Sequence, residues 1–204
     1  MSSASTVLVP PARFGRWVEN FTERHDGCTL AVDSGTLVGR AGDGSSFTAH
    51  PPFDESYDGP AEVAAFTSTC GPPGRWGVLL VRKGGFAIAR LAGEQTVESK
   101  VGQRHVQGRT KAGGQSQQRF ARRRDNQARV AYEAAAEHAA RILTGAMSVV
   151  TGGDHSAVEA VLTDRRLAGL VVVAPFLAVP DPRRSILEQA VTDAGSIRVE
   201  VTNS

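Results

Sequence analysis

The sequence predicts a mixed α/β fold, in which helices flank a sheet that combines parallel and antiparallel strand pairs. Three observations predict this class. Short apolar runs between residues 76 and 101 are separated by glycine-containing turns, which indicates an antiparallel meander. An alanine-rich run with helical periodicity follows, and strand-like and helix-like runs then alternate. With 204 residues, of which 41% are hydrophobic, the chain is expected to form one domain over residues 1–204.

The first sixty residues predict one helix and two short strands. Large apolar residues recur at three- and four-residue spacing within Pro11–His25, which predicts a helix over that range. Strands are expected over Cys28–Asp33 and Thr36–Gly39. The segment Ala41–Gly59 is rich in glycine, proline, aspartate and serine, and a loop is expected there.

The middle of the chain predicts the meander, a loop and a long helix. The meander strands are expected over Trp76–Arg82, Phe86–Leu91 and Gln95–Val101. Residues 102–118 have no apolar periodicity and contain four glycines, so a mobile loop is expected over about that range. From about Arg119 to Leu143, a stripe of inward-facing apolar residues predicts a helix: Ala121, Ala128, Ala131, Ala135, Ala139 and Ile142.

The last third predicts alternating strands and helices, as in folds with some parallel strand pairing. In chain order, the expected elements are a strand, a helix, a strand, a helix and a strand: Met147–Val150, His155–Leu162, Leu167–Val173, Arg183–Ala194 and Ile197–Val201.

Charge is distributed unevenly along the chain, whose formal net charge is +2. Residues 100–129, here called the basic segment, contain one acid, Asp125, and nine basic residues: Lys100, Arg104, Arg109, Lys111, Arg119, Arg122, Arg123, Arg124 and Arg129. This segment therefore carries +8, and the rest of the chain carries −6. A solvated helix face usually mixes both signs, whereas one-sided arginine-rich charge indicates nucleic-acid binding.

The remaining composition indicates a cytoplasmic protein. Cys28 and Cys70 lie far apart in the sequence, which indicates free thiols in a reducing compartment. The first ten residues lack the features of a signal peptide, and no apolar run reaches membrane-spanning length. The histidines show no metal-ligand spacing, so no metal is expected. No other cofactor is expected, and neither is contact with a membrane.

The clearest chemical motif is a Gly-Gly-Gln tripeptide at the start of the arginine-rich run. Gly113 and Gly114 allow positive φ angles and a close backbone approach to a crowded substrate. The neutral amide of Gln115 can hold a water molecule by hydrogen bonds. Such a tripeptide alone is common by chance, but here the sequence Arg-Phe-Ala-Arg follows it at 119–122.

Residues 113–124 closely resemble the motif of the catalytic middle domain of eukaryotic and archaeal class I peptide-chain release factors. In that family a Gly-Gly-Gln loop leads into a long basic helix, and the order of the elements predicted here fits that domain. The resemblance implies a release-factor middle-domain-like fold with a ribonuclease-H-like mixed sheet. It also implies that the expected loop at about 102–118 is the catalytic loop.

In size and architecture the chain is more similar to the Vms-like peptidyl-tRNA hydrolases of ribosome quality control, which include a short actinobacterial branch. They use a release-factor-like domain without a stop-codon-reading domain, for which 204 residues leave no room. The resemblance implies that Gln115 is the catalytic glutamine, supported by Gly113 and Gly114. Part of that family has the looser motif Gly-x-x-Gln, which Gly114 and Gln117 satisfy, so Gln117 remains the alternative.

The chemistry of glutamine restricts the mechanism. Its amide has no accessible pKa, so Gln115 cannot act as a general base at neutral pH. It can position a water molecule while a backbone N–H stabilises the developing oxyanion. The resemblance implies that the ester is the peptidyl-tRNA linkage and that ribosomal RNA completes the site. We therefore expect the isolated protein to hydrolyse its substrate poorly.

The expected function is release of nascent chains from stalled ribosomes or large subunits, at the peptidyl-transferase centre. The expected partners are the ribosome, its rRNA and peptidyl-tRNA. Phosphates are expected to be bound by six basic residues: Lys111, Arg109, Arg119, Arg122, Arg123 and Arg124.

Two alternatives remain open. The first is a non-catalytic ribosome-binding factor of the same fold that recruits other factors, although relatives of that kind lack the Gly-Gly-Gln tip. The second is an RNA nuclease, which would need a metal or an acid–base pair, and the basic segment offers only His105 for that chemistry.

Overall fold

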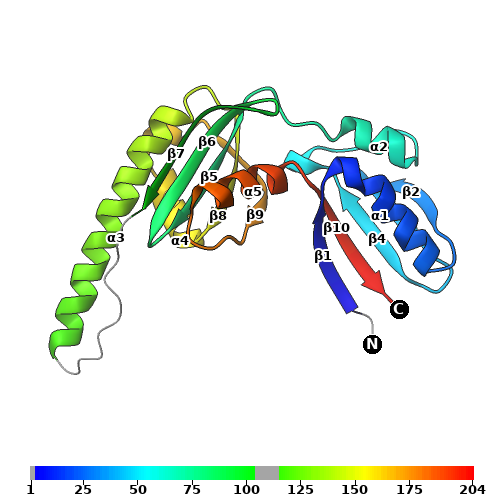
Figure 1. Ribbon diagram of the computed structural model, residues 1–204, viewed down its shortest axis with the longest axis horizontal. Coiled ribbons are helices and arrows are strands. Elements are labelled where there is room, and N and C mark those ends of the chain that lie inside the picture. Colours follow the sequence, from blue (N-terminus) through cyan, green and yellow to red (C-terminus); the bar gives the residue numbers. More distant parts are fainter. Residues whose placement is uncertain (1–2, 104–114) are drawn as a thin grey trace. The chain divides into compact units, whose positions relative to one another are not determined.

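The computed structural model describes residues 3–103 and 115–204, and of residues 3, 103 and 115–128 it describes the backbone alone. The chain divides into two compact units, one formed by Met1–Pro73 with Val191–Ser204 and the other by Gly74–Ala190. Each unit contains a five-stranded sheet (Figure 1). The predicted mixed α/β class is confirmed. One catalytic domain over residues 1–204 stays a prediction, and the structure adds an internal division, because each sheet buries its own apolar cluster.

The first unit is an antiparallel sheet with helices packed on its apolar residues. Its strand order is β1-β10-β4-β3-β2. Phe14 and Phe21 of α1 and Phe66 of α2 share a buried cluster with Phe47 of the sheet. The elements of this unit are β1 (Ser3–Val9), α1 (Pro11–Arg24), β2 (Thr29–Asp33), β3 (Thr36–Arg40), β4 (Ser46–His50), a 3-10 turn (Pro52–Asp54), α2 (Val63–Thr69) and β10 (Ile197–Asn203).

Three elements of this unit differ from the sequence-based expectation. Strand β1 was not expected, because its small polar residues have no strand-like alternation; it forms by pairing with β10 from the far end of the chain. Strand β4 lies inside the expected loop Ala41–Gly59, where Phe47 and Ala49 alternate with polar residues and point into the core. Helix α2 was also missed, and it buries Phe66 alone among its residues.

The second unit has a mixed sheet with strand order β7-β6-β5-β8-β9. The β5–β8 and β8–β9 pairs are parallel, and β5–β6 and β6–β7 are antiparallel. The elements of this unit are β5 (Trp76–Arg82), β6 (Gly85–Ala92), β7 (Gln95–Gln103), α3 (Gln115–Ile142), β8 (Ser148–Gly153), α4 (His155–Leu162), a 3-10 turn (Arg165–Leu167), β9 (Val171–Leu177) and α5 (Arg184–Ala194), within which the boundary between the units falls.

Helices α3 and α4 pack against β5, β6 and β8 through one apolar cluster. The expected inward stripe of α3 is confirmed in its C-terminal half, where Ala135, Ala139 and Ile142 are fully buried. Alanine side chains are short, so they allow the helix backbone to approach the sheet closely. At the end of the helix, Leu143 packs directly over the backbone of Gly77.

Several boundaries in the second unit differ from expectation. Strand β8 extends past its expected end at Val150 to Gly153, where it still pairs with β5. The expected strand Leu167–Val173 begins at Val171 and continues to Leu177, because Leu167 belongs to a 3-10 turn and Pro175 is accommodated inside the strand. The expected loop at about 102–118 is shorter at both ends, because Gly102 continues the ladder opposite Phe86 and α3 begins at Gln115. Residues 104–114 lie outside the described residues.

Replacing Gly77 by alanine is expected to lower the free energy of unfolding by about 1–3 kcal/mol, the usual cost of overpacking a core. The added Cβ would lie 2.4 Å from Cδ2 of Leu143 and 3.0 Å from the carbonyl oxygen of Ala89. Urea denaturation followed by circular dichroism measures the change. The matched control is Gly169→Ala, where an added Cβ meets nothing within 4 Å. Equal unfolding midpoints for the two variants would contradict close packing at Gly77.

Candidate functional site

The candidate site begins at one edge of the mixed sheet. The strand registers align Gln103 with Gly85, Gly85 with Arg82, and Val81 with Gly153. Strand β7 therefore ends at the same edge as the parallel strands β5 and β8. In open α/β sheets, ligands bind outside the carboxyl ends of the parallel strands. In the sequence, the Gly-Gly-Gln motif follows the end of β7.

The predicted site residues divide into two groups. Arg109, Lys111, Gly113 and Gly114 lie outside the described residues. The others lie along the N-terminal half of α3, where the structure describes only the backbone: Gln115, Gln117, Arg119, Arg122, Arg123 and Arg124. The catalytic and RNA-binding roles of these residues therefore stay predictions.

Helix α3 extends well beyond the sheet. Its C-terminal half lies beside β6 and β7, and its N-terminal half runs past the end of the strands (Figure 1). With 28 residues, an α-helix is about 42 Å long. Gln115 is the first residue of α3, so it lies at the end of the helix that is far from the sheet.

A small apolar cavity lies where α3 leaves the sheet. Its volume is about 250 Å³, and its walls include Phe86, Gly102, Val130 and Ala135. The Phe86 ring covers the backbone of Gly102, so that a Cβ at Gly102 would lie 2.4 Å from a ring carbon. The ring also contacts the His138 imidazole, with 5.4 Å between ring centroids. Phe86 therefore links the last residues of the strand β7 to α3 at the point where the two elements separate.

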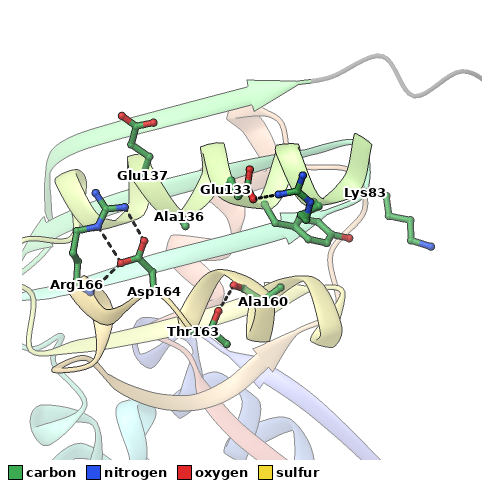
Figure 2. Close-up of a pocket in the computed structure, with 10 residues that line it drawn as sticks. Lys83, Glu133, Ala136, Glu137, Ala160, Thr163, Asp164 and Arg166 are labelled. Carbon is green, nitrogen blue, oxygen red and sulfur yellow. Dashed lines mark hydrogen bonds and ion pairs between the residues drawn. The ribbon is translucent and has the colours of Figure 1, made fainter. Parts of the chain in front are cut away.

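A larger groove of about 730 Å³ runs between α3 and α4. Figure 2 shows Lys83 at one end and Arg166, Asp164 and Glu137 at the other. Two ion pairs lie along its walls, Arg129–Glu133 and Arg166–Asp164. Its lining contains three basic and three acidic side chains, so it lacks the one-sided positive charge that a phosphate backbone requires. We therefore assign it no RNA-binding role.

The ion pair at the Asp164 end of the groove is well formed. The Arg166 guanidinium donates from Nε and Nη2 to the two carboxylate oxygens of Asp164, at 3.0 and 2.7 Å. The backbone N–H of Arg166 donates to the same carboxylate at 2.9 Å. These hydrogen bonds from Arg166 lower the pKa of the Asp164 carboxyl to about 2. At the other end, burial and the nearby Asp154 carboxylate raise the pKa of Tyr132.

The groove was not predicted from the sequence. Its walls come from the β5–β6 turn, α3, α4 and a 3-10 turn, which are far apart along the chain. Ala136 of α3 and Ala160 of α4 both line the groove, and their short side chains leave space between the helices. These two alanines are the one feature of the sequence that relates to the groove. Among the described residues, no group of three or more histidine, cysteine or carboxylate side chains is arranged to hold a metal ion. No helix in the described parts of the chain is long and apolar enough to cross a membrane.

Comparison with known proteins gives one family match. The model of the actinobacterial and chloroflexi VLRF1 release factors matches residues 74–200, which is more than half of the chain and includes the whole second unit. No curated protein matches the chain.

The solved structures that are similar to this chain include three at low identity. The Vms1 mitochondrial localization core is 13% identical, with a TM-score of 0.43 and coverage of 89% of this chain and 81% of that one. The archaeal termination factor aRF1 is 11% identical, with a TM-score of 0.31 and coverage of 94% and 64%. Archaeoglobus fulgidus Pelota is 9% identical, with a TM-score of 0.25 and coverage of 94% and 63%. The chain thus spans less than two thirds of the last two proteins.

Replacing Arg166 by methionine is expected to raise the pKa of Asp164 from about 2 towards its ordinary value of 3.8. A carboxyl whose folded pKa lies below its unfolded pKa stabilises the fold above the unfolded value, and this stabilisation is lost as the pH falls. In the wild-type protein the stabilisation that ionised Asp164 contributes should therefore be lost as the pH falls from about 4 to about 2. Titration of the Asp164 carboxyl carbon by NMR measures the pKa, with Arg16→Met as the control. An unchanged pKa in Arg166→Met would refute this cause of the shift.

Proposed function

Because the chain belongs to the actinobacterial and chloroflexi VLRF1 release-factor family, its role lies in translation, and we propose that it is a ribosome-dependent peptidyl-tRNA hydrolase. In this proposal it frees nascent chains from stalled ribosomes or large subunits and acts as a cytoplasmic protein. The proposal is supported above all by the start of α3 at Gln115, at the end of the helix that is far from the sheet.

The proposed reaction is hydrolysis of the ester that joins the nascent peptide to tRNA. A water oxygen attacks the ester carbonyl carbon, and the bond from that carbon to the ribose oxygen breaks. Of the two protons of the attacking water, one is taken up by the ribose oxygen and the other goes to solvent, which leaves intact tRNA and a free peptide carboxylate. The amide of Gln115 accepts a hydrogen bond from the attacking water through its oxygen or donates one to it through its N–H. It transfers no proton, because it has no accessible pKa.

The flanking glycines have a complementary role in this mechanism. Gly113 and Gly114 lack a Cβ, so the backbone can approach the reacting carbon closely. A backbone N–H in that approach can stabilise the oxyanion as it forms. The rest of the rate enhancement comes from holding water and ester together, which depends on ribosomal RNA to orient the tRNA.

The proposed RNA contacts are the phosphates of rRNA or tRNA along the basic segment. Its +8 charge contrasts with the −6 of the remaining residues. Four of the predicted phosphate-binding arginines lie in the N-terminal half of the long α3 helix. Arginine is suited to this role, because its planar guanidinium binds phosphate oxygens in pairs.

Replacing Gln115 by alanine is expected to reduce peptide release by at least about 100-fold, the usual scale for losing one group that stabilises a hydrolytic transition state. The assay is single-turnover release of labelled peptide from ribosomal complexes that carry peptidyl-tRNA. The parallel variant Gln117→Ala tests the alternative glutamine. The matched control is Gln95→Ala, which removes an exposed glutamine at the start of β7.

The products of the same assay separate the proposal from its alternatives. Free peptide with intact tRNA supports hydrolysis of the ester. Cleaved tRNA would favour the nuclease, and ribosome binding without any product would favour the recruitment factor. Full activity in both glutamine variants would refute the water-positioning mechanism.

Ribosome binding is expected to weaken steeply with salt, since each phosphate contact releases a counterion. Replacing both Arg122 and Arg123 by alanine should reduce the slope of log affinity against log salt concentration by about 1–2. Binding is measured by co-sedimentation with large subunits between low and physiological salt. Arg16→Ala is the control, because Arg16 lies in an exposed pair with Glu19 on α1. An unchanged slope in the double variant would contradict phosphate binding by these two arginines.

A further inference from the structure

The last turn of α3 is held by one pair of facing residues on β6 and β7. Arg90 and Glu98 are opposite each other in the β6–β7 register. Arg90 donates from Nε to the carbonyl oxygen of Ile142, at 2.8 Å. Glu98 forms an ion pair with Arg141. Two neighbouring residues on the sheet therefore bind two consecutive residues at the C-terminal end of the helix.

The local geometry favours this arrangement. The register shifts by one residue directly after the pair, because Leu91 faces Thr96. Such a bulge bends the strand and changes the direction of nearby side chains. Arg90 is half-buried and places its positive charge beside the negative end of the helix dipole. The other partners are more accessible, with 35% of the Glu98 side chain and 59% of the Arg141 side chain exposed.

Packing is looser where α3 leaves the sheet. The cavity of about 250 Å³ lies between α3 and the ends of β5, β6 and β7, beneath Val130, Ala134 and Ala135. Where such a space lies between a helix and a sheet, the helix makes fewer packing contacts with the sheet. The contacts at the C-terminal end of α3 therefore contribute to its direction, together with its packing on the sheet and on α4.

The length of the helix makes small rotations important. From Ile142 to Gln115, α3 rises about 40 Å at 1.5 Å per residue. A tilt of about 1.5° at the last turn then displaces Gln115 by about 1 Å, and a misplacement of that size can cost about 100-fold in rate.

We propose that Arg90 and Glu98 are positioning residues, which set the direction of α3 and thereby the place of Gln115 at the ester. The inference rests on the proposed function for its catalytic consequence. Its structural part, that this pair fixes the direction of the helix, is independent of any activity.

The kinetic test compares Arg90→Met, Arg90→Lys, Glu98→Gln and Arg141→Gln with the wild-type protein. Misplacement of Gln115 should lower kcat by at least about 10-fold. KM should stay within about 2-fold of the wild-type value, since the phosphate-binding residues are unchanged. Arg90→Lys keeps a charged donor and should recover part of the rate lost in Arg90→Met. Glu98→Gln and Arg141→Gln should not add in the double variant, because they remove the same ion pair.

A stability measurement separates positioning from folding. Exposed ion pairs contribute little to stability, so Glu98→Gln and Arg141→Gln should shift Tm by less than about 3 °C. The control variant is Arg16→Met, which breaks a comparable exposed pair on α1 and should change neither kcat nor KM. A fall in kcat that simply follows a large fall in Tm would overturn the proposal.

A distance measurement tests the helix direction without any substrate. Spin labels at Glu94→Cys and Arg129→Cys, in a Cys28→Ser, Cys70→Ala background, report the distance between the β6–β7 turn and α3 by pulsed electron paramagnetic resonance. The distance distribution should broaden or shift in Arg90→Met and in Glu98→Gln, and not in Arg16→Met. An unchanged distribution with unchanged kcat would overturn the proposal. A changed distribution in a protein that releases no peptide even as wild type would support the positioning role and refute the proposed hydrolase.

Discussion

The contact between α3 and the mixed sheet is the interaction on which the second unit depends. Ala135, Ala139 and Ile142 are fully buried against residues such as Leu79 and Ile88. The short alanine side chains bring the helix axis near the strands. The C-terminal half of the helix packs in this way, and its N-terminal half runs past the ends of the strands (Figure 1). One continuous helix is therefore both part of the core and an extension beyond the sheet.

The sequence predicted the second unit better than the first, for physical reasons. The meander and α3 depend on contacts between neighbouring segments and on strong periodicity, which local patterns reveal. Strand β1 depends instead on pairing with β10, nearly two hundred residues later, and its first residues, Ser3, Ala4 and Ser5, carry no local strand signal. Strand β4 lies in a segment whose glycines and prolines indicated a loop, although alternate burial of Phe47 and Ala49 stabilises it as a strand. The division into two units follows from these long-range pairings.

The family could be predicted from a short run of residues, because the glycines, the glutamine and the arginines that carry the resemblance lie close together in the sequence. The family resemblance is confirmed by the match over residues 74–200, whereas the roles of Gln115 and Gln117 stay predictions. The groove between α3 and α4 and the Arg90–Glu98 pair could not be predicted. Each depends on side chains that meet only after folding, and the pair further depends on a register shift that no local pattern indicates.

The pairing of β1 with β10 also determines the order in which the protein can fold during its own synthesis. Strand β10 lies between β1 and β4 in the sheet of the first unit, but the whole second unit precedes it along the chain. The first unit must therefore wait for that unit to be translated, an interval on the order of ten seconds at cellular rates. During this interval β1 lacks its partner, and β4 exposes an edge that can pair with other chains. A copy interrupted before residue 197 would lack β10, so it would expose these unpaired segments to chaperones and proteases.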